Sequence, residues 1–168
     1  MMKTYPTTRF GNLSFEEGDI LRFPEGIPGF EVHTQWVLAG EENDPIKWLQ
    51  SLSDGSVALP VTTPDIAAPG YNAKLPKTEL ERLEMEKVED LAVLIVLSIP
   101  AFFWETTANL CAPIVINTKK RLGRQIIAEN EEYGLKHNIW DDAARRKMAE
   151  ENERLGRSTA SASNPEGQ

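Results

Sequence analysis

The residues that could do chemistry in this chain are one cysteine, two histidines and many carboxylates. Cys111 lies inside a predicted strand, which favours a place in the core over a role as nucleophile. His33 and His137 fall on separate predicted loops, and neither has a cysteine or carboxylate at metal-ligand spacing. The chain also lacks a nucleophile elbow, a phosphate-binding loop and a dinucleotide-binding glycine pattern. We therefore predict a protein that is not an enzyme and uses no metal or cofactor.

The carboxylates are densest between residues 79 and 90, at Glu79, Glu81, Glu84, Glu86, Glu89 and Asp90. A charge run of this kind is most often a solvated face. The chain carries a net charge of −8, and because six acids and five bases follow residue 140, −7 belongs to the part before it. An acidic body repels phosphate and steers basic proteins toward itself. Our hypothesis is that a basic protein contacts four of these residues: Glu84, Glu86, Glu89 and Asp90.

Three consecutive aromatic residues, 102–104, follow Pro100 in a predicted connection between strands. One interpretation folds this connection back over one end of the domain, in line with the usual burial of aromatic residues. The other leaves an exposed anchor for an amphipathic helix, since aromatic residues make good binding hot spots. We carry Phe103 and Trp104 forward as candidate partner-binding residues.

Two other classes of function stay open. Lys119, Lys120, Arg121 and Arg124 form a basic hairpin tip that could touch phosphate, so the chain could be an RNA-binding barrel. On an acidic body, a solvated turn explains this tip better. A carbohydrate-directed enzyme would need two carboxylates about 5 to 10 Å apart across a cleft, and the sequence gives no sign of such a pair.

Short runs of β-branched and aromatic residues, separated by Gly, Pro, Asn and Asp, dominate the chain up to residue 129. This rhythm is typical of many short strands joined by turns, and it predicts an all-β fold. The predicted strands are residues 7–10, 14–23, 35–39, 47–52, 57–61, 91–99, 108–117 and 123–129. Thr78 and Glu81 have the spacing of a capping box, which predicts a short helix with Leu80 and Leu83 on one face.

Two segments carry detailed turn signals. In residues 23–30, Pro24 and Pro28 each preset φ for the second position of a turn, and Gly29 provides the positive φ of a type II turn. The aromatic and aliphatic side chains between these turns are predicted to plug one end of the core. In residues 106–117, alternation predicts a strand, Pro113 predicts an edge or a bulge, and the bracketing asparagines, Asn109 and Asn117, are predicted to cap turns.

The C-terminal part differs in composition. Residues 141–155 begin with two acids and have i, i+4 charge pairs at Asp141/Arg145, Asp142/Arg146 and Glu150/Arg154, but their apolar stripe is thin. Residues 157–168 are small and of low complexity, which predicts a disordered tail. A single cysteine gives no disulfide, and no bilayer-length apolar run or leader appears, so we expect a cytoplasmic protein.

The motifs occur in an order that resembles the FliW family of flagellar assembly factors. They are Phe-Pro-Glu-Gly-Ile-Pro-Gly-Phe at 23–30, Trp-Leu-Gln-Ser at 48–51, Pro-Gly-Tyr at 69–71, the segment 107–117, and Gly-Arg-Gln at 123–125 leading to Tyr133. The resemblance covers residues 7–138. Its marker residues, mainly structural, are Phe23, Pro24, Gly26, Pro28, Gly29, Phe30, Gln50, Tyr71, Asn109, Pro113, Asn117 and Gln125.

This resemblance implies a small antiparallel β-barrel-like domain in residues 1–140, followed by a charged helical extension, 141–156, and the tail. It further implies that the protein binds flagellin as a chaperone in the cytoplasm. When free of flagellin, it would bind the translational repressor CsrA and antagonise it allosterically, which relieves repression of flagellin synthesis. Neither nucleic acid nor membrane is an expected partner, and we expect a monomer when the protein is free.

Overall fold

The computed structural model describes the backbone of residues 1–163 and the side chains of residues 1–157. Its strands are β1 (Met2–Thr7), β2 (Gly11–Glu16), β3 (Leu21–Arg22), β4 (Gln35–Ala39), β5 (Ile46–Ser51), β6 (Ala58–Thr62), β7 (Leu91–Ser98), β8 (Thr107–Ala108), β9 (Ile114–Asn117), β10 (Leu122–Gln125) and β11 (His137–Asn138). Its helices are α1 (Pro64–Ala67), α2 (Lys77–Arg82) and α3 (Asp142–Ser163), with short 3₁₀ turns η1 (Glu17–Asp19), η2 (Val88–Asp90) and η3 (Phe103–Glu105). The all-β prediction is confirmed.

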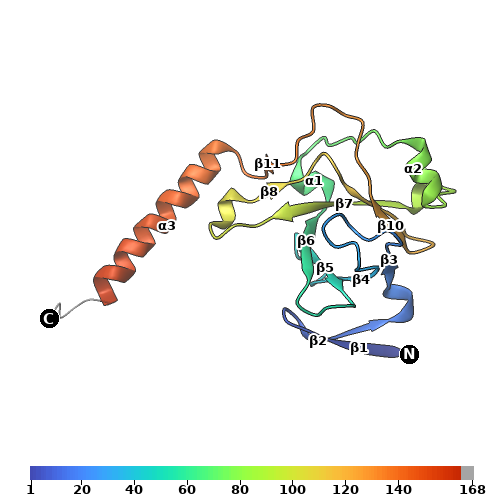
Figure 1. Ribbon diagram of the computed structural model, residues 1–168. Coiled ribbons are helices and arrows are strands. Elements are labelled where there is room, and N and C mark those ends of the chain that lie inside the picture. Colours follow the sequence, from blue (N-terminus) through green and yellow to red (C-terminus); the bar gives the residue numbers. More distant parts are fainter. Residues whose placement is uncertain (164–168) are drawn as a thin grey trace.

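Seven strands close into a barrel. They follow the order β7-β6-β5-β4-β3-β10-β9, and β9 pairs with β7 again to complete the ring (Figure 1). All neighbours are antiparallel except β3 and β10, which are parallel. β7 is the longest strand at eight residues, and its second half also pairs with β8, which in turn pairs with β11. Closure removes the open sheet edges of the ring.

The barrel interior is a continuous apolar core. Its centre holds Leu21, Phe23, Trp36, Leu49, Val61 and Ile114, all at most 2% exposed. Phe23 can sit there because Gly123 of β10 has no side chain: a Cβ at that position would lie 2.3 Å from the Phe23 ring. Two smaller clusters lie under α1 and under α2, the second built on Leu83, Val115 and Ile126. Leu80 also packs there, which confirms the predicted apolar face of the short helix.

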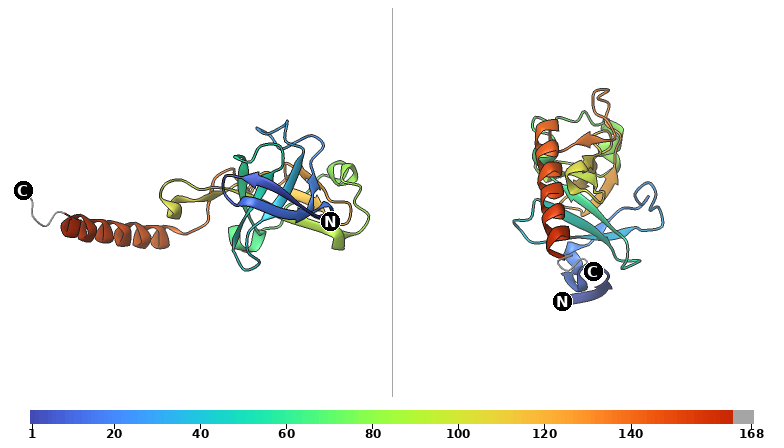
Figure 2. Two further views of the ribbon diagram at one scale, coloured as in Figure 1. Left: turned by 90° about the horizontal axis from the view of Figure 1, so that it is seen from below. Right: turned by 90° about the vertical axis from the view of Figure 1, so that its left-hand side faces the viewer.

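A separate hairpin of β1 and β2 lies below the barrel in Figure 1 and is seen face-on in the left view of Figure 2. Thr8 N–H donates to the Gly55 carbonyl at 3.0 Å, which ties the hairpin to the turn between β5 and β6. The strand predicted at residues 7–10 is therefore wrong, since only Thr7 lies in a strand, at the end of β1, and residues 8–10 form the hairpin turn. The search for runs of β-branched and aromatic residues missed β1, because the residues of this strand are mostly polar and exposed.

Two other predicted strands are interrupted. The segment 14–23 holds β2 and β3 with η1 between them, and 108–117 holds the end of β8 and all of β9, with irregular backbone at 109–113. The capping box at Thr78 is also wrong. Pro76 occupies the N-cap, and no side chain caps α2. The fixed φ of this proline suits the entry to a helix, so α2 begins at Lys77, two residues before the start that a Thr78 cap would give.

Helix α3 projects away from the barrel (Figures 1 and 2). It continues to Ser163, so it enters the segment 157–168 that was predicted to be a disordered tail. Extension of an existing helix costs little, and the alanines there have high helix propensity. The remaining residues of that segment, 164–168, lie outside the described residues. Among the helices that the structure describes, none has the length and apolar composition needed to cross a membrane.

Candidate binding surface

The turn motif at 23–30 has a structural role. Gly26 N–H donates to the Phe23 carbonyl at 2.7 Å, and Phe30 N–H donates to the Ile27 carbonyl at 2.6 Å, so both predicted turns form. Gly29 has a φ of 92°, as the type II turn requires. Phe23 and Ile27 are buried, and Phe30 packs edge-on against Trp36. The prediction that these side chains plug the core is confirmed.

Other marker residues satisfy backbone groups at strand ends. Gln50 is fully buried, and its Nε2 donates to the carbonyls of Ser51 and Val57. Asn109 Oδ1 accepts from the backbone N–H of Ala112, and Gln125 Nε2 donates to the Ala112 carbonyl at 2.9 Å, next to the buried Pro113. The prediction that Asn109 caps a turn is confirmed.

Tyr71 links two loops. Its hydroxyl donates to the Leu110 carbonyl at 2.7 Å, and its ring packs on Tyr133 with centroids 4.5 Å apart. Burial, followed by the nearby Tyr133 and Cys111 groups, raises the pKa of Tyr71 to about 12. The hydroxyl is therefore a neutral hydrogen-bond donor at physiological pH, in keeping with a structural role.

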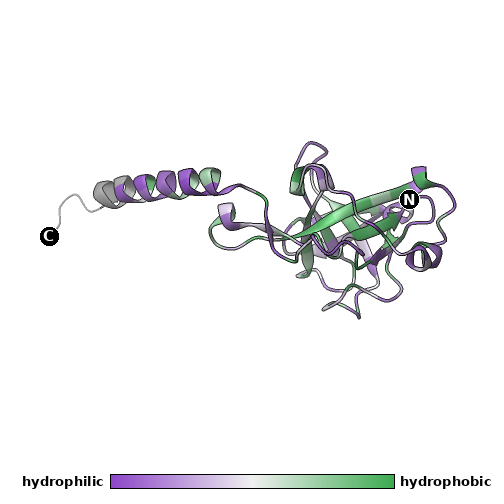
Figure 3. Cartoon of the chain, turned by 90° about the horizontal axis from the view of Figure 1, so that it is seen from above, coloured by the Kyte–Doolittle hydropathy of each residue, from purple (hydrophilic) through white to green (hydrophobic). Residues whose placement is uncertain are grey.

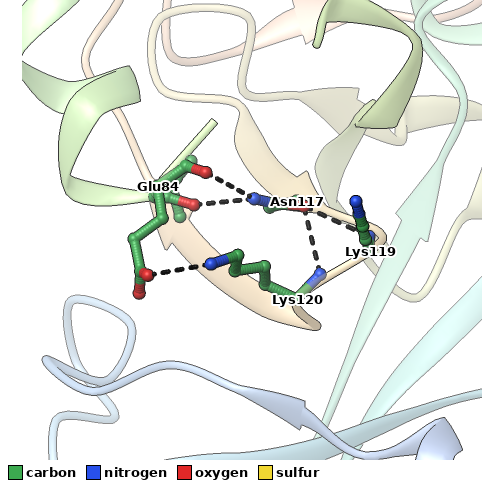
Figure 4. A network of polar contacts seen from close by, with 5 residues as sticks. Glu84, Asn117, Lys119 and Lys120 are labelled. Atoms are coloured by element: carbon green, nitrogen blue, oxygen red, sulfur yellow. Dashed lines mark hydrogen bonds and ion pairs between the residues drawn. The ribbon is translucent and has the colours of Figure 1, made fainter. Parts of the chain in front are cut away.

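Asn117 anchors the start of the acidic segment, by which we mean residues 84–90. Its Nδ2 donates to the carbonyls of Leu83 and Glu84, at 2.8 and 3.2 Å, while its Oδ1 accepts from the backbone N–H groups of Lys119 and Lys120 (Figure 4). Asn117 is 2% exposed. Its bonds to the backbone of Lys119 and Lys120 confirm the prediction that this asparagine caps a turn. Glu84 has a φ of 54°, an uncommon conformation that these contacts hold in place.

The other end of the acidic segment rests on the same β9–β10 turn. The backbone N–H and the hydroxyl of Thr118 both donate to the Asp90 carbonyl, at 2.8 and 2.9 Å. β7 then begins, with Leu91 opposite Asn117 in the register. The segment is thus a loop fixed at both ends, with its middle, Met85 to Glu89, outside the barrel.

The six carboxylates between 79 and 90 divide into two groups. Glu79 pairs with Arg124, and Glu84 pairs with Lys120 at 3.2 Å. Glu81, Glu86 and Glu89 are exposed, and none of them joins an ion pair among the described residues. Asp90 is half-buried. Of the four predicted contact residues, Glu86 and Glu89 are therefore the ones that are both exposed and without an ion pair among the described residues, and Glu84 is already partnered.

Arg124 ties α2 to the first turn of the motif. It pairs with Glu79 on α2 and with Glu25, which also pairs with Arg82 at 3.8 Å. Partial burial lowers the pKa of the Arg124 guanidinium, but the hydrogen bonds and charges of Glu79 and Glu25 outweigh it, so the pKa is raised above its ordinary value. A cavity of about 470 Å³ lies beside these side chains, and its carboxylates serve as ion-pair partners.

The basic hairpin tip is largely occupied by contacts within the protein. Lys120 pairs with Glu84, Arg121 donates to the Asp19 carbonyl at 2.9 Å, and Arg124 lies in β10 and not at the tip. Basic side chains that are committed to carboxylates and backbone carbonyls have less charge to offer a phosphate. This arrangement weakens the case for phosphate binding at the tip.

The aromatic residues after β7 form a ledge, which we define as Phe102, Phe103, Trp104 and Trp140. Trp104 is only 6% exposed, so the prediction that it anchors a partner is wrong. It stacks on Phe102 at 5.0 Å and meets Phe103 edge-on, which leaves those two rings 58% and 52% exposed. Trp140 packs edge-on against Phe103 at 5.6 Å. Sequence reasoning missed Trp140, although an aromatic residue just before a helix was an available signal.

The structure does not bring the two candidate surfaces together. The acidic segment precedes β7 and the ledge follows it (Figure 1). Eight strand residues separate the surfaces by roughly 25 Å, at about 3.3 Å per residue. One is a charged loop and the other an exposed aromatic patch. Among the described residues, no group of three or more Cys, His, Asp or Glu could hold a metal ion.

This combination defines a small β-barrel protein with two exposed candidate docking surfaces. Comparison with known protein families then gives the family. The family model with the description "FliW protein" matches residues 4–139 of this chain. The chain belongs to the FliW family.

Individual relatives agree. Flagellar assembly factor FliW from Alkaliphilus metalliredigens is 37% identical over 147 residues, 86% of this chain and 90% of the relative. The protein of the same name from Thermotoga maritima is 41% identical over 142 residues, 83% of this chain and 95% of the relative. A crystal structure of the flagellar assembly factor FliW matches with a TM-score of 0.77 and 37% identity, covering 83% of this chain and 99% of that one.

Proposed function

We propose that this protein acts in flagellar assembly by binding other proteins and not by catalysis. In the cytoplasm it holds flagellin as a chaperone, and when free it binds a CsrA-type translational repressor and antagonises it allosterically. The name flagellar assembly factor, carried by its relatives, supports the process. The observation that carries the binding mode is the acidic segment, a loop fixed at both ends that presents Glu86 and Glu89 without ion-pair partners among the described residues.

The acidic segment fits a CsrA-type partner by charge. A protein that holds RNA needs basic surface, and an acidic domain meets such a surface favourably. The segment is also preorganised, because Asn117 and Thr118 fix its ends before any partner arrives. A preorganised loop loses less conformational entropy on binding than a free one.

The ledge fits flagellin. Phe102 and Phe103 are large, exposed and stiffened by their contacts with Trp104 and Trp140. Rigid aromatic side chains of this kind receive the apolar face of an amphipathic helix. Folded partners that extend along the barrel toward each other by more than the roughly 25 Å between the surfaces would also collide, which is a physical basis for competition.

The proposed binding of flagellin at the ledge is tested by titration calorimetry with purified flagellin and the purified CsrA-type regulator. The double variant Phe102→Ala and Phe103→Ala should weaken flagellin binding roughly thirtyfold, by about 2 kcal/mol, and leave the regulator's affinity unchanged. Ile127→Ala with Leu135→Ala is the matched control, since both residues are exposed aliphatic side chains outside the ledge. Equal affinities of both double variants for flagellin would remove the ledge from the proposal.

Competition is tested by adding flagellin to the preformed complex with the regulator. We expect displacement of the regulator in proportion to flagellin, followed by size-exclusion chromatography. A stable ternary complex would contradict the competition and leave the two binding activities to be judged separately.

A further inference from the structure

Helix α3 lies beyond the part of the chain that defines the family, since the family match ends at residue 139. Its contacts with the rest of the protein gather at its start, where Arg145 pairs with Glu105 at 2.9 Å and Trp140 meets Phe103. From Glu150 to Arg157 every residue is exposed. Figures 1 and 2 show the helix extending from the barrel.

A helix without a packing partner is only marginally stable in water. Most residues in the described part of α3 are hydrophilic (Figure 3), but Ala144, Met148 and Leu155 fall on one face, at spacings of four and seven residues. Leu155 is 51% exposed. This narrow stripe has the form of a helix-pairing seam.

The charges of α3 indicate what covers the seam. Basic residues occupy 145–147, and acidic residues occupy 150, 151 and 153, so the two blocks flank Met148. In an antiparallel pair with a two-fold axis near Met148, each basic block lies against the acidic block of the other copy. Lys147, which joins no ion pair among the described residues, then faces Glu151 of the second copy, and that carboxylate also pairs with Arg154 of its own helix.

The same arrangement matches the apolar ends. Leu155 lies seven residues after Met148, and Trp140 lies eight residues before it, so an antiparallel pair sets Leu155 of one copy near Trp140 and Phe103 of the other. Two half-exposed apolar groups, Leu155 and Phe103, then cover each other. Phe103 would take part in this contact and, at other times, in the proposed flagellin contact.

We propose that α3 pairs antiparallel with α3 of a second copy, which makes the free protein a two-fold symmetric dimer. The inference does not rest on the proposed function, and it replaces the monomer expected from the sequence. At 22 residues the helix is about 33 Å long and about 10 Å wide, so the contact falls below a standard interface of roughly 800 Å² per partner. We therefore expect the dimer to be in reversible equilibrium with the monomer.

Sedimentation velocity of the full chain over a micromolar concentration series tests the proposal. Wild type should move from monomer to dimer as concentration rises. Lys147→Glu and Glu151→Lys, each alone, should remain monomeric, because each places like charges across the seam. Glu150→Lys, on the opposite face of the helix, is the control and should dimerise as wild type does, with helicity of every variant checked by circular dichroism.

The decisive sample is a mixture of Lys147→Glu with Glu151→Lys. A heterodimer of the two restores opposite charges at both contacts, so the mixture should sediment as a dimer although neither component does. A monomeric wild type at all concentrations, or a monomeric mixture, would overturn the proposal. Monomeric wild type with flagellin binding lost in Lys147→Glu would overturn it as well and assign the seam to flagellin.

Discussion

At the scale of single residues, the asparagine and tyrosine of the family motifs act through the backbone groups they satisfy. Asn117 makes four hydrogen bonds from a buried position and so joins the acidic segment to the β9–β10 turn. Tyr71 joins the loop after α1 to the loop before β9. Residues of this kind fix the position of loops through the backbone groups that they satisfy.

Replacement of Asn117 by alanine should lower the free energy of unfolding by about 2 to 3 kcal/mol, because buried carbonyls lose their donor. The urea midpoint should fall, with little change in the slope of the transition. Asn12→Ala, at an exposed hairpin position, is the control and should behave as wild type. An unchanged midpoint for Asn117→Ala would mean that the hydrogen bonds of the Asn117 side chain do not stabilise the fold.

Tyr71 gives a prediction at high pH. Its pKa is about 12 in the folded protein, above the ordinary value of 10.0, so the folded state holds this proton more tightly than the unfolded state. The resulting stability is complete below pH 10 and is lost as pH rises through 12. Wild type should therefore lose stability more steeply than Tyr71→Phe between these values in urea unfolding. Parallel curves for the two proteins would contradict the assignment.

Not all residue roles could be foreseen. The turn motif at 23–30 was predictable because proline and glycine act locally, through their own φ angles. The pairing of Glu79 and Glu84 was not, because their cations, Arg124 and Lys120, lie 45 and 36 residues away in the chain. Trp104 was predicted to be an exposed contact residue but is buried. Three adjacent aromatic residues have no periodicity from which the buried one could be told from the exposed ones.

At the scale of elements, β10 is the strand on which barrel closure depends. It pairs in parallel with β3 and antiparallel with β9, and its Gly123 leaves room for the Phe23 ring. The all-β class and most strands were predictable from turn rhythm. The ring order was not, because the pairings of β3 with β10 and of β7 with β9 join segments far apart in sequence.

Gly123→Ala should destabilise the barrel by about 1 to 3 kcal/mol, since its Cβ would overlap a fully buried ring. Gly134→Ala, where an added Cβ meets nothing within 4 Å, is the matched control. Thermal unfolding followed by circular dichroism should show a lower midpoint for Gly123→Ala alone. Equal midpoints for the two variants would show that β10 can move away from the Phe23 ring at little cost.

At the scale of the whole molecule, a closed barrel places a charged loop and an aromatic ledge at opposite ends of β7, and a charged helix extends from the ledge end (Figure 1). Most of the negative charge lies on residues 1–140. We propose one surface for a basic partner, one for an amphipathic helix and one for a second copy, and Phe103 belongs to the last two. The proposal for the basic partner can therefore fail independently of the other two.

The central proposal is that the free carboxylates of the acidic segment hold a basic CsrA-type regulator. The most direct measurement is calorimetric affinity at low and high salt for Glu86→Lys with Glu89→Lys, beside the control Glu41→Lys with Glu42→Lys, which changes the net charge equally at another exposed loop. We predict a loss of roughly tenfold or more and a weaker salt dependence for the first pair alone. Equal affinities of both pairs at both salt concentrations would contradict the proposal.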